Sequence, residues 1–156
     1  MMKMMAPLLA CGVLLLGCSS SKTQQGRPEM MLTYSAKSAL LNFETRIEVT
    51  GEILTLFHRS VQPKRDIQEK FTPDTAEVGG LYRYLERVKL HDMQQPKGER
   101  MLDAPDEKIT ATFQGRTTTF SIGNVKDLSE EIVQLRKQII DLAVKHSPAM
   151  KEALGY

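Results

Sequence analysis

Apolar and polar residues alternate along much of the chain after residue 29, and this pattern predicts strands. Residues 30–34 carry an apolar side chain at every second position, and in residues 43–49 Phe43, Thr45, Ile47 and Val49 alternate with charged residues. The same alternation occurs in residues 109–113 and 118–122. A period of two places alternate side chains on opposite faces, which is typical of a half-buried strand.

Glycine-first dipeptides at positions 51–52 and 115–116 predict two hairpins. A two-residue loop with Gly in first place is typical of a type II′ turn, whose twist matches that of the flanking strands. The implied cross-strand pairs are Val49 with Leu54, Ile47 with Leu56, Phe113 with Thr118 and Ala111 with Phe120. All of these pairs place apolar side chains on a single face of the sheet.

Two stretches carry apolar residues at helical spacing. The first covers residues 78–88, and Thr72-Pro73 before it supplies an N-cap and a first-turn proline. The second covers residues 128–142, with a capping-box-like start at residues 127–130 and a stop at Ser147-Pro148. Both stretches predict amphipathic helices that pack against the sheet.

The order of elements is therefore strand, hairpin, helix, hairpin, helix. Residues 60–71 and 93–105 are charged or rich in proline and predict loops. This order favours an α+β fold, with an antiparallel sheet of about five strands and two helices packed on one face. We expect a single α+β domain at residues 30–147, followed by a short C-terminal tail at residues 148–156.

The first residues have a different character. Lys3 precedes an apolar run at residues 4–16, which predicts a secretory signal peptide over residues 1–17. An uncleaved transmembrane anchor is the first alternative, but roughly 20 apolar residues are needed to span a bilayer. Secretion with an ordinary cleavage site is the second alternative.

The tetrapeptide Leu15-Leu16-Gly17-Cys18 resembles the lipobox of bacterial lipoprotein precursors. The resemblance implies that Cys18 is acylated and holds the protein to a lipid bilayer. Cys11 ends a similar tetrapeptide, but it would leave an apolar core of only residues 4–7, where signal peptides need roughly 7 to 15 residues.

Residues 18–29 are then the lipidated N-terminus and a flexible linker, because they are polar and contain Gly and Pro. Ser19 directly follows the modified Cys. By the same resemblance, an Asp at that position retains a lipoprotein at the inner membrane. We therefore expect the bacterial cell envelope, with the outer membrane facing the periplasm favoured.

The search for chemistry predicts no catalytic residue, no metal site and no cofactor. His58, His91 and His146 are dispersed, and none has a partner at metal-ligand spacing. An acidic cluster at residues 103–107 lacks the regular oxygens and the Gly turn of a calcium loop, so we expect a solvated loop. Cys18, if acylated, leaves no thiol for a disulfide or for catalysis.

The charge balance also narrows the choice of partner. The chain has 21 Lys and Arg residues against 19 Asp and Glu residues. Nothing in that balance indicates a nucleic-acid partner. A non-catalytic binding protein is the favoured class, and an undetected hydrolase is an alternative.

Residues 35–42 link the first two strands and carry the adjacent Leu40 and Leu41. Two adjacent side chains cannot face the same side of a strand. Either one leucine tucks beneath the sheet while the other touches a helix, or the loop presents an apolar side chain to a protein partner. Leu40 and Leu41 are therefore the candidate contacts with an envelope protein.

The element order, the loop after the first strand and the closing amphipathic helix resemble the emfourin-type inhibitors of thermolysin-like metalloproteases, over residues 30–146. The resemblance implies a second function, which is inhibition of a periplasmic or secreted protease. Such inhibitors carry a Gly-rich segment where this chain has Ser, Ala, Lys and Ser at residues 35–38. No inhibitory residue is carried over for that reason.

Overall fold

The computed structural model describes residues 29–98, 103–123 and 125–156. The signal peptide, the lipobox with Cys18 and the linker up to residue 28 lie outside the described residues. The described elements are β1 Met30–Ser38, β2 Phe43–Thr50, β3 Leu54–Val61, β4 Lys64–Phe71, α1 Thr75–Arg87, the 3-10 turn η1 Leu90–Asp92, β5 Asp106–Phe113, β6 Arg116–Ser121, α2 Glu130–His146 and α3 Pro148–Leu154.

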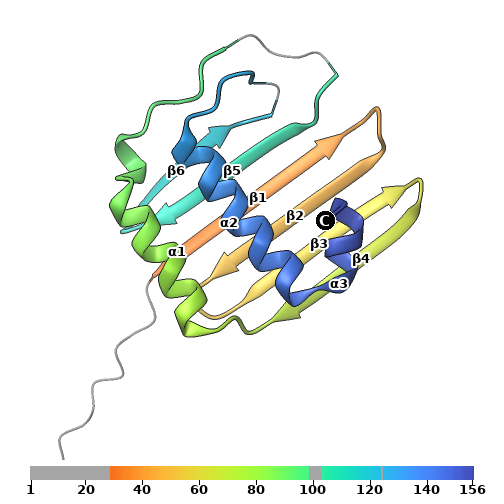
Figure 1. Cartoon of the computed structure of the whole chain (residues 1–156), viewed down its shortest axis with the longest axis horizontal. Helices are drawn as coiled ribbons and strands as arrows, with labels where there is room; N and C mark the ends of the chain where they lie inside the picture. Colours follow the sequence, from red (N-terminus) through yellow and green to blue (C-terminus); the bar gives the residue numbers. More distant parts are fainter. Residues whose placement is uncertain (1–28, 99–102, 124) are drawn as a thin grey trace, which may run out of the picture.

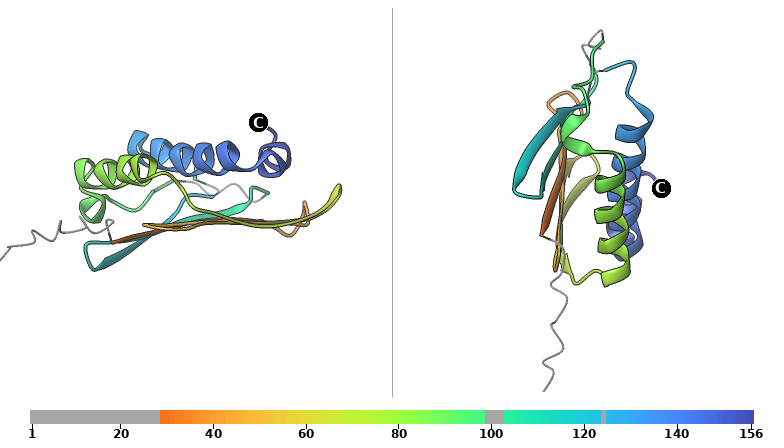
Figure 2. Two further views of the ribbon diagram at one scale, coloured as in Figure 1. Left: turned by 90° about the horizontal axis from the view of Figure 1, so that it is seen from below. Right: turned by 90° about the vertical axis from the view of Figure 1, so that its left-hand side faces the viewer.

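The fold is α+β, as predicted, and it has two layers. Over the described residues the strands form one antiparallel sheet of six, in the order β4-β3-β2-β1-β5-β6. The helices α1, α2 and α3 all cover the same face of this sheet, and no helix of the described residues covers the other face (Figures 1 and 2). One face is therefore apolar and the other polar, which is why the strands alternate so clearly in sequence.

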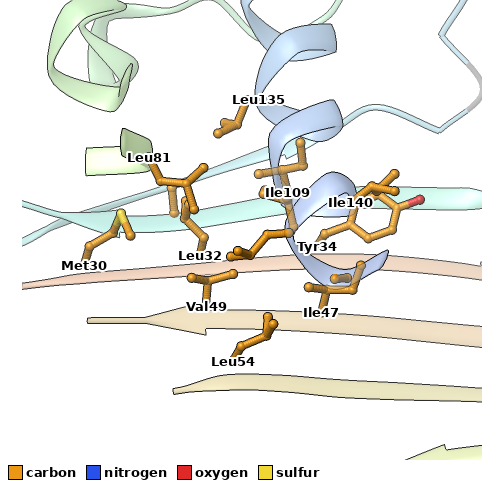
Figure 3. Close-up of a cluster of buried hydrophobic side chains, with 14 of the residues drawn as sticks. Met30, Leu32, Tyr34, Ile47, Val49, Leu54, Leu81, Ile109, Leu135 and Ile140 are labelled. Carbon is orange, nitrogen blue, oxygen red and sulfur yellow. The ribbon is translucent and has the colours of Figure 1, made fainter. Parts of the chain in front are cut away.

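The core lies between the sheet and the helices. Leu32 of β1, Ile47 of β2 and Ile109 of β5 have no exposed surface, and they point toward the helices (Figure 3). Ile139 and Leu135 of α2 meet them from the helix side and are also buried. The apolar stripe predicted for this helix is thus part of the core.

The β2–β3 hairpin has the predicted register but a different turn. Val49 pairs with Leu54. Gly51, however, lacks the positive φ that a type II′ turn requires. The Thr50 hydroxyl instead accepts hydrogen bonds from the N–H groups of Glu52 (3.3 Å) and Ile53 (2.9 Å), so a side chain holds the turn.

The β5–β6 hairpin is shifted by two residues from the predicted register. Phe113 pairs with Arg116, and not with Thr118. The turn is Gln114-Gly115, with φ of 49° and 71°. A type I′ turn needs a positive φ at both central residues, which Gly accepts best. A shift of two keeps every side chain on its predicted face, so the core is unaffected.

The prediction of a loop over residues 60–71 is wrong, because this segment completes β3 and forms β4. Lys64, Asp66 and Lys70 point to the open face, while Ile67 is buried on the covered face. Charged side chains are common on an edge strand, where they discourage pairing with another sheet. These charges concealed the strand in the sequence, and the sheet has six strands where we expected about five.

Both main helices begin two residues later than predicted. Asp74 caps α1: its side chain accepts the Ala76 N–H at 3.0 Å, and Glu77 accepts the Asp74 N–H at 2.8 Å. This is a complete capping box. Ser129 caps α2 by accepting the Ile132 N–H, a role that we had expected Asp127 to fill.

The expected C-terminal tail contains a third helix, α3. The Ser147 hydroxyl accepts the Met150 N–H at 3.0 Å, and Pro148 occupies the first turn. Met150 is fully buried, and Gly155 ends the helix with a φ of 74°. Burial of one large side chain holds this short helix against the sheet, since isolated helices of this length are marginal in water.

Candidate binding cleft

A cleft of about 460 Å³ lies at the end of the sheet where the β1–β2 and β3–β4 turns meet. Its floor is the covered face of β1, β2 and β3. Its walls come from α2, α3 and the two turns. In Figure 1, α2 crosses the sheet obliquely, and α3 lies over β3 and β4. We call this space the hairpin cleft.

The two candidate contact leucines lie in the β1–β2 turn, beside the hairpin cleft. Leu40 is 72% exposed and Leu41 is 58% exposed. Leu41 lines the hairpin cleft, and its N–H donates to the Ser38 hydroxyl at 3.1 Å, which holds the turn. Neither leucine is tucked beneath the sheet, so the first of the two readings of this loop is wrong.

An ion pair crosses the mouth of the cleft between Arg65 of β4 and Glu152 of α3. Nη2 of Arg65 lies 2.7 Å from Oε1 of Glu152. The side chain of Arg65 is 23% exposed, whereas that of Glu152 is 73% exposed. The hydrogen bond from Arg65 and its positive charge lower the pKa of Glu152.

A second ion pair lies deeper, between Arg136 of α2 and Glu107 of β5. Nε of Arg136 is 2.9 Å from Oε2 of Glu107, and Nη2 donates to Oε1 at 3.1 Å. The Glu107 side chain is only 16% exposed, so it does not belong to the solvated loop that we expected for the acidic cluster. Burial and the charge of Glu107 raise the pKa of the neighbouring Tyr34 to about 12.

His58 lies on the floor of the cleft and is buried. Its Nδ1 is 2.8 Å from Oγ1 of Thr45. Burial, assisted by the charge of Arg65, lowers the pKa of His58, so the ring is neutral at neutral pH. A hydrolytic triad needs a carboxylate that stabilises the imidazolium form, and here a cation disfavours that form. The geometry at His58 therefore does not favour a hydrolytic triad built on this residue.

The other two histidines have structural partners elsewhere. His91 contacts the Thr118 hydroxyl at 2.7 Å and the Phe113 carbonyl at 2.8 Å. His146 contacts Glu77 at 3.0 Å. Among the described residues, no three His, Cys, Asp or Glu side chains come together in a way that could hold a metal ion.

Sequence reasoning missed the two residues that span the mouth of the cleft. Arg65 falls in the segment predicted as a loop, and Glu152 in the segment expected to be a tail. They are 87 positions apart, and no local pattern links residues so distant. One signal was available: Gln62-Pro63 separates two runs of similar length, which is the layout of a hairpin.

The chain matches no protein-family model and no curated protein. None of the helices in residues 29–98, 103–123 and 125–156 has the length and apolar character needed to cross a membrane. The geometry of the hairpin cleft is therefore the main guide to function.

Proposed function

We propose that this chain is a bacterial envelope lipoprotein, anchored through acylated Cys18, whose α+β domain binds another envelope protein at the hairpin cleft. The observation that carries the binding role is the exposure of Leu40 and Leu41 beside that cleft. The anchor and the outer-membrane location rest on the lipobox and on Ser19.

An exposed leucine pair next to a concave surface supports a protein contact. Burying one leucine side chain completely is worth roughly 1.5–3 kcal/mol, so two leucines supply a substantial part of a moderate affinity. The remaining wall of the cleft offers both apolar and charged side chains, such as Phe43, Leu154 and Arg65. An apolar centre with a polar rim is the usual anatomy of a protein interface.

The binding role can be tested by crosslinked pull-down from envelope extract, with the full-length lipoprotein as bait. The test variant carries Leu40→Ser and Leu41→Ser. The control carries Ile53→Ser, because Ile53 is also exposed but lies in the β2–β3 turn at the other end of the sheet. We expect the leucine variant to lose the specific partner and the control to keep it, with both folds remaining cooperative. Unchanged capture by the leucine variant would refute a contact at this loop.

The anchor is tested separately by metabolic labelling with a fatty acid. Cys18→Ser should abolish labelling, and Cys11→Ser should leave it intact. Labelling that depends on Cys11 would refute the assigned cleavage site. A protease among the partners captured by the wild-type chain, inhibited by that chain in a purified assay, would favour the inhibitor function.

A further inference from the structure

The two arginines of the hairpin cleft have different environments, and the difference indicates what the cleft binds. This inference rests on the proposed function, because it concerns the chemistry of the partner segment. Both Arg65 and Arg136 line the cleft, and each faces one carboxylate.

Arg136 is 40% exposed at its side chain, but its carboxylate partner is poorly exposed. Two of its nitrogens contact the two oxygens of Glu107, whose side chain is only 16% exposed. Removing one member of a poorly solvated pair leaves the other charge uncompensated, so this pair resists exchange with a ligand. Arg136 therefore holds α2 to β5 and is less available to an incoming anion than Arg65.

Arg65 is only partly engaged. A guanidinium carries five N–H groups. In the part of the chain that the structure describes, only Nη2 of Arg65 makes a hydrogen bond, and its acceptor Glu152 is 73% exposed. Exposed ion pairs contribute little to stability, so a ligand carboxylate can displace Glu152 at small cost.

Apart from Glu152 and the Arg136–Glu107 pair, the residues that line the cleft with Arg65 are apolar or neutral. Leu41, Pro63 and Leu154 line the same cleft. Burial and the charge of Arg65 lower the pKa of His58, which lines the same cleft, so its neutral ring adds no second cation. At about 460 Å³ the cleft falls within the range of pockets that hold small ligands, and it suits an apolar side chain next to an anionic group.

We propose that the hairpin cleft binds the free C-terminal carboxylate of a partner polypeptide. Arg65 takes this carboxylate in place of Glu152, and the apolar side chain beside it packs against Leu41 and Leu154. A planar guanidinium suits a carboxylate because it can donate two parallel hydrogen bonds. Both arginines face a carboxylate, but the partner of Arg65 is the exposed one, so an incoming carboxylate can exchange with it at the smaller cost.

The test uses two pools of N-acetylated random hexapeptides, one with free carboxyl ends and one with amidated ends. Each pool is passed over the immobilised full chain, and retained peptides are identified by mass spectrometry. We expect the wild-type chain to favour the free acids about tenfold, with an apolar residue at or beside the last position. Retention of amidated peptides through internal Asp or Glu would show that the recognised carboxylate is not the C-terminal one, and would overturn the proposal.

Three variants separate recognition from folding. Arg65→Gln should lose the preference for free acids. Glu152→Gln breaks the same ion pair but keeps the cation, so it should retain free acids at least as well as the wild type. Arg59→Gln is the matched control, because Arg59 lies on the same hairpin outside the cleft, where it contacts Asp66 at 3.8 Å and the ring of Phe57. If Glu152→Gln loses the preference for free acids as completely as Arg65→Gln, the effect is structural and the proposal is overturned.

Failure of this inference is distinguishable from failure of the proposed function. If the wild-type chain retains neither pool but still captures its envelope partner through Leu40 and Leu41, recognition of the carboxylate is refuted and the binding role stands. If the free acids bind but the pull-down does not depend on the leucine pair, the contact at the loop is refuted and recognition by Arg65 stands.

Discussion

Oε2 of Glu77 lies 3.0 Å from Nε2 of His146, and this contact joins the start of α1 to the end of α2. The same carboxylate accepts the backbone N–H of Asp74 at 2.8 Å and a hydrogen bond from Lys145. One side chain thus caps a helix and links it to its neighbour. Burial alone would raise the pKa of Glu77, but these hydrogen bonds and the charge of His146 hold it at about 2.

The first prediction concerns acid stability. The pKa of Glu77 falls from its ordinary 4.5 to about 2 on folding, so its contribution is complete above pH 4.5 and is lost as the pH falls toward 2. Glu77→Gln should lower the free energy of unfolding by roughly 1–2 kcal/mol at pH 7, after allowance for solvent screening. Urea denaturation of both chains at pH 7 and pH 3 measures the difference. If the difference in the free energy of unfolding between the two chains is the same at pH 7 and pH 3, the prediction is wrong.

The second prediction concerns alkaline stability. Burial and the charge of Glu107 raise the pKa of Tyr34 from 10.0 to about 12, so the folded chain holds this proton more tightly than the unfolded chain. The stabilisation is complete below pH 10 and is lost as the pH rises toward 12. The advantage of the wild type over Tyr34→Phe should therefore shrink across this window. Tyr82→Phe is the control, and chemical denaturation at several pH values gives the comparison.

The third prediction tests the two faces of β1 with neighbouring residues. Leu32 is fully buried beneath the helices, whereas Met31 is 41% exposed on the open face. Leu32→Ala should cost about 2–5 kcal/mol, because it removes buried apolar atoms and leaves a cavity. Met31→Ala should cost less than about 1 kcal/mol. Similar losses in both variants, measured by thermal unfolding, would mean that the strand faces are assigned incorrectly.

The fourth prediction compares two neighbouring threonines of β6, Thr118 and Thr119, whose side chains lie on opposite faces of the sheet. The Thr118 hydroxyl lies 2.7 Å from Nδ1 of His91, whose Nε2 contacts the Phe113 carbonyl and so carries the proton. Thr118→Val leaves the Nδ1 acceptor without its donor and should destabilise the fold by about 1 kcal/mol. Thr119→Val affects only an exposed hydroxyl on the other face and should stay within about 0.5 kcal/mol. Equal effects would show that His91 does not depend on Thr118.

The features that sequence reasoning predicted correctly depend on burial. Every second residue of β1 and β2 is covered by the helices, so the alternation in the sequence reports the sheet directly. The stripe on α2 is legible for the same reason: Ile132, Leu135, Ile139 and Leu142 are all buried. In these elements the removal of apolar surface from water determines which positions are apolar, so the period of the strand or helix can be seen in the sequence.

The sequence predictions were wrong where something other than the burial of apolar side chains determines the structure. Residues of β4 are charged because the strand lies at an edge, and this composition also suits a loop. The turn after Phe113 follows from the backbone preference of Gly115 for positive φ, which fixes the register without any apolar signal. The N-cap of α1 was predicted at Thr72, and the capping box between Asp74 and Glu77 places it two residues later instead.

The cleft was the least predictable feature because its charged residues meet only in three dimensions. Arg136 and Glu107 are 29 positions apart, and Arg65 and Glu152 are 87 apart. Only the leucine pair gave a local signal, since adjacent leucines in a short turn cannot both be buried on one face. The sequence could not say which leucine is exposed, and the structure shows that both are.

The two ends of the described chain differ in their distance from the hairpin cleft. Glu152 and Leu154 line the cleft, so a tag or fusion partner attached after Tyr156 would crowd its mouth. Met30 begins β1, whereas the β1 residues that line the cleft are Tyr34 and Ala36, roughly 14–20 Å further along the strand. A surface or bilayer attached before Met30 would therefore leave the cleft open on the far side of the domain, where a partner can approach it.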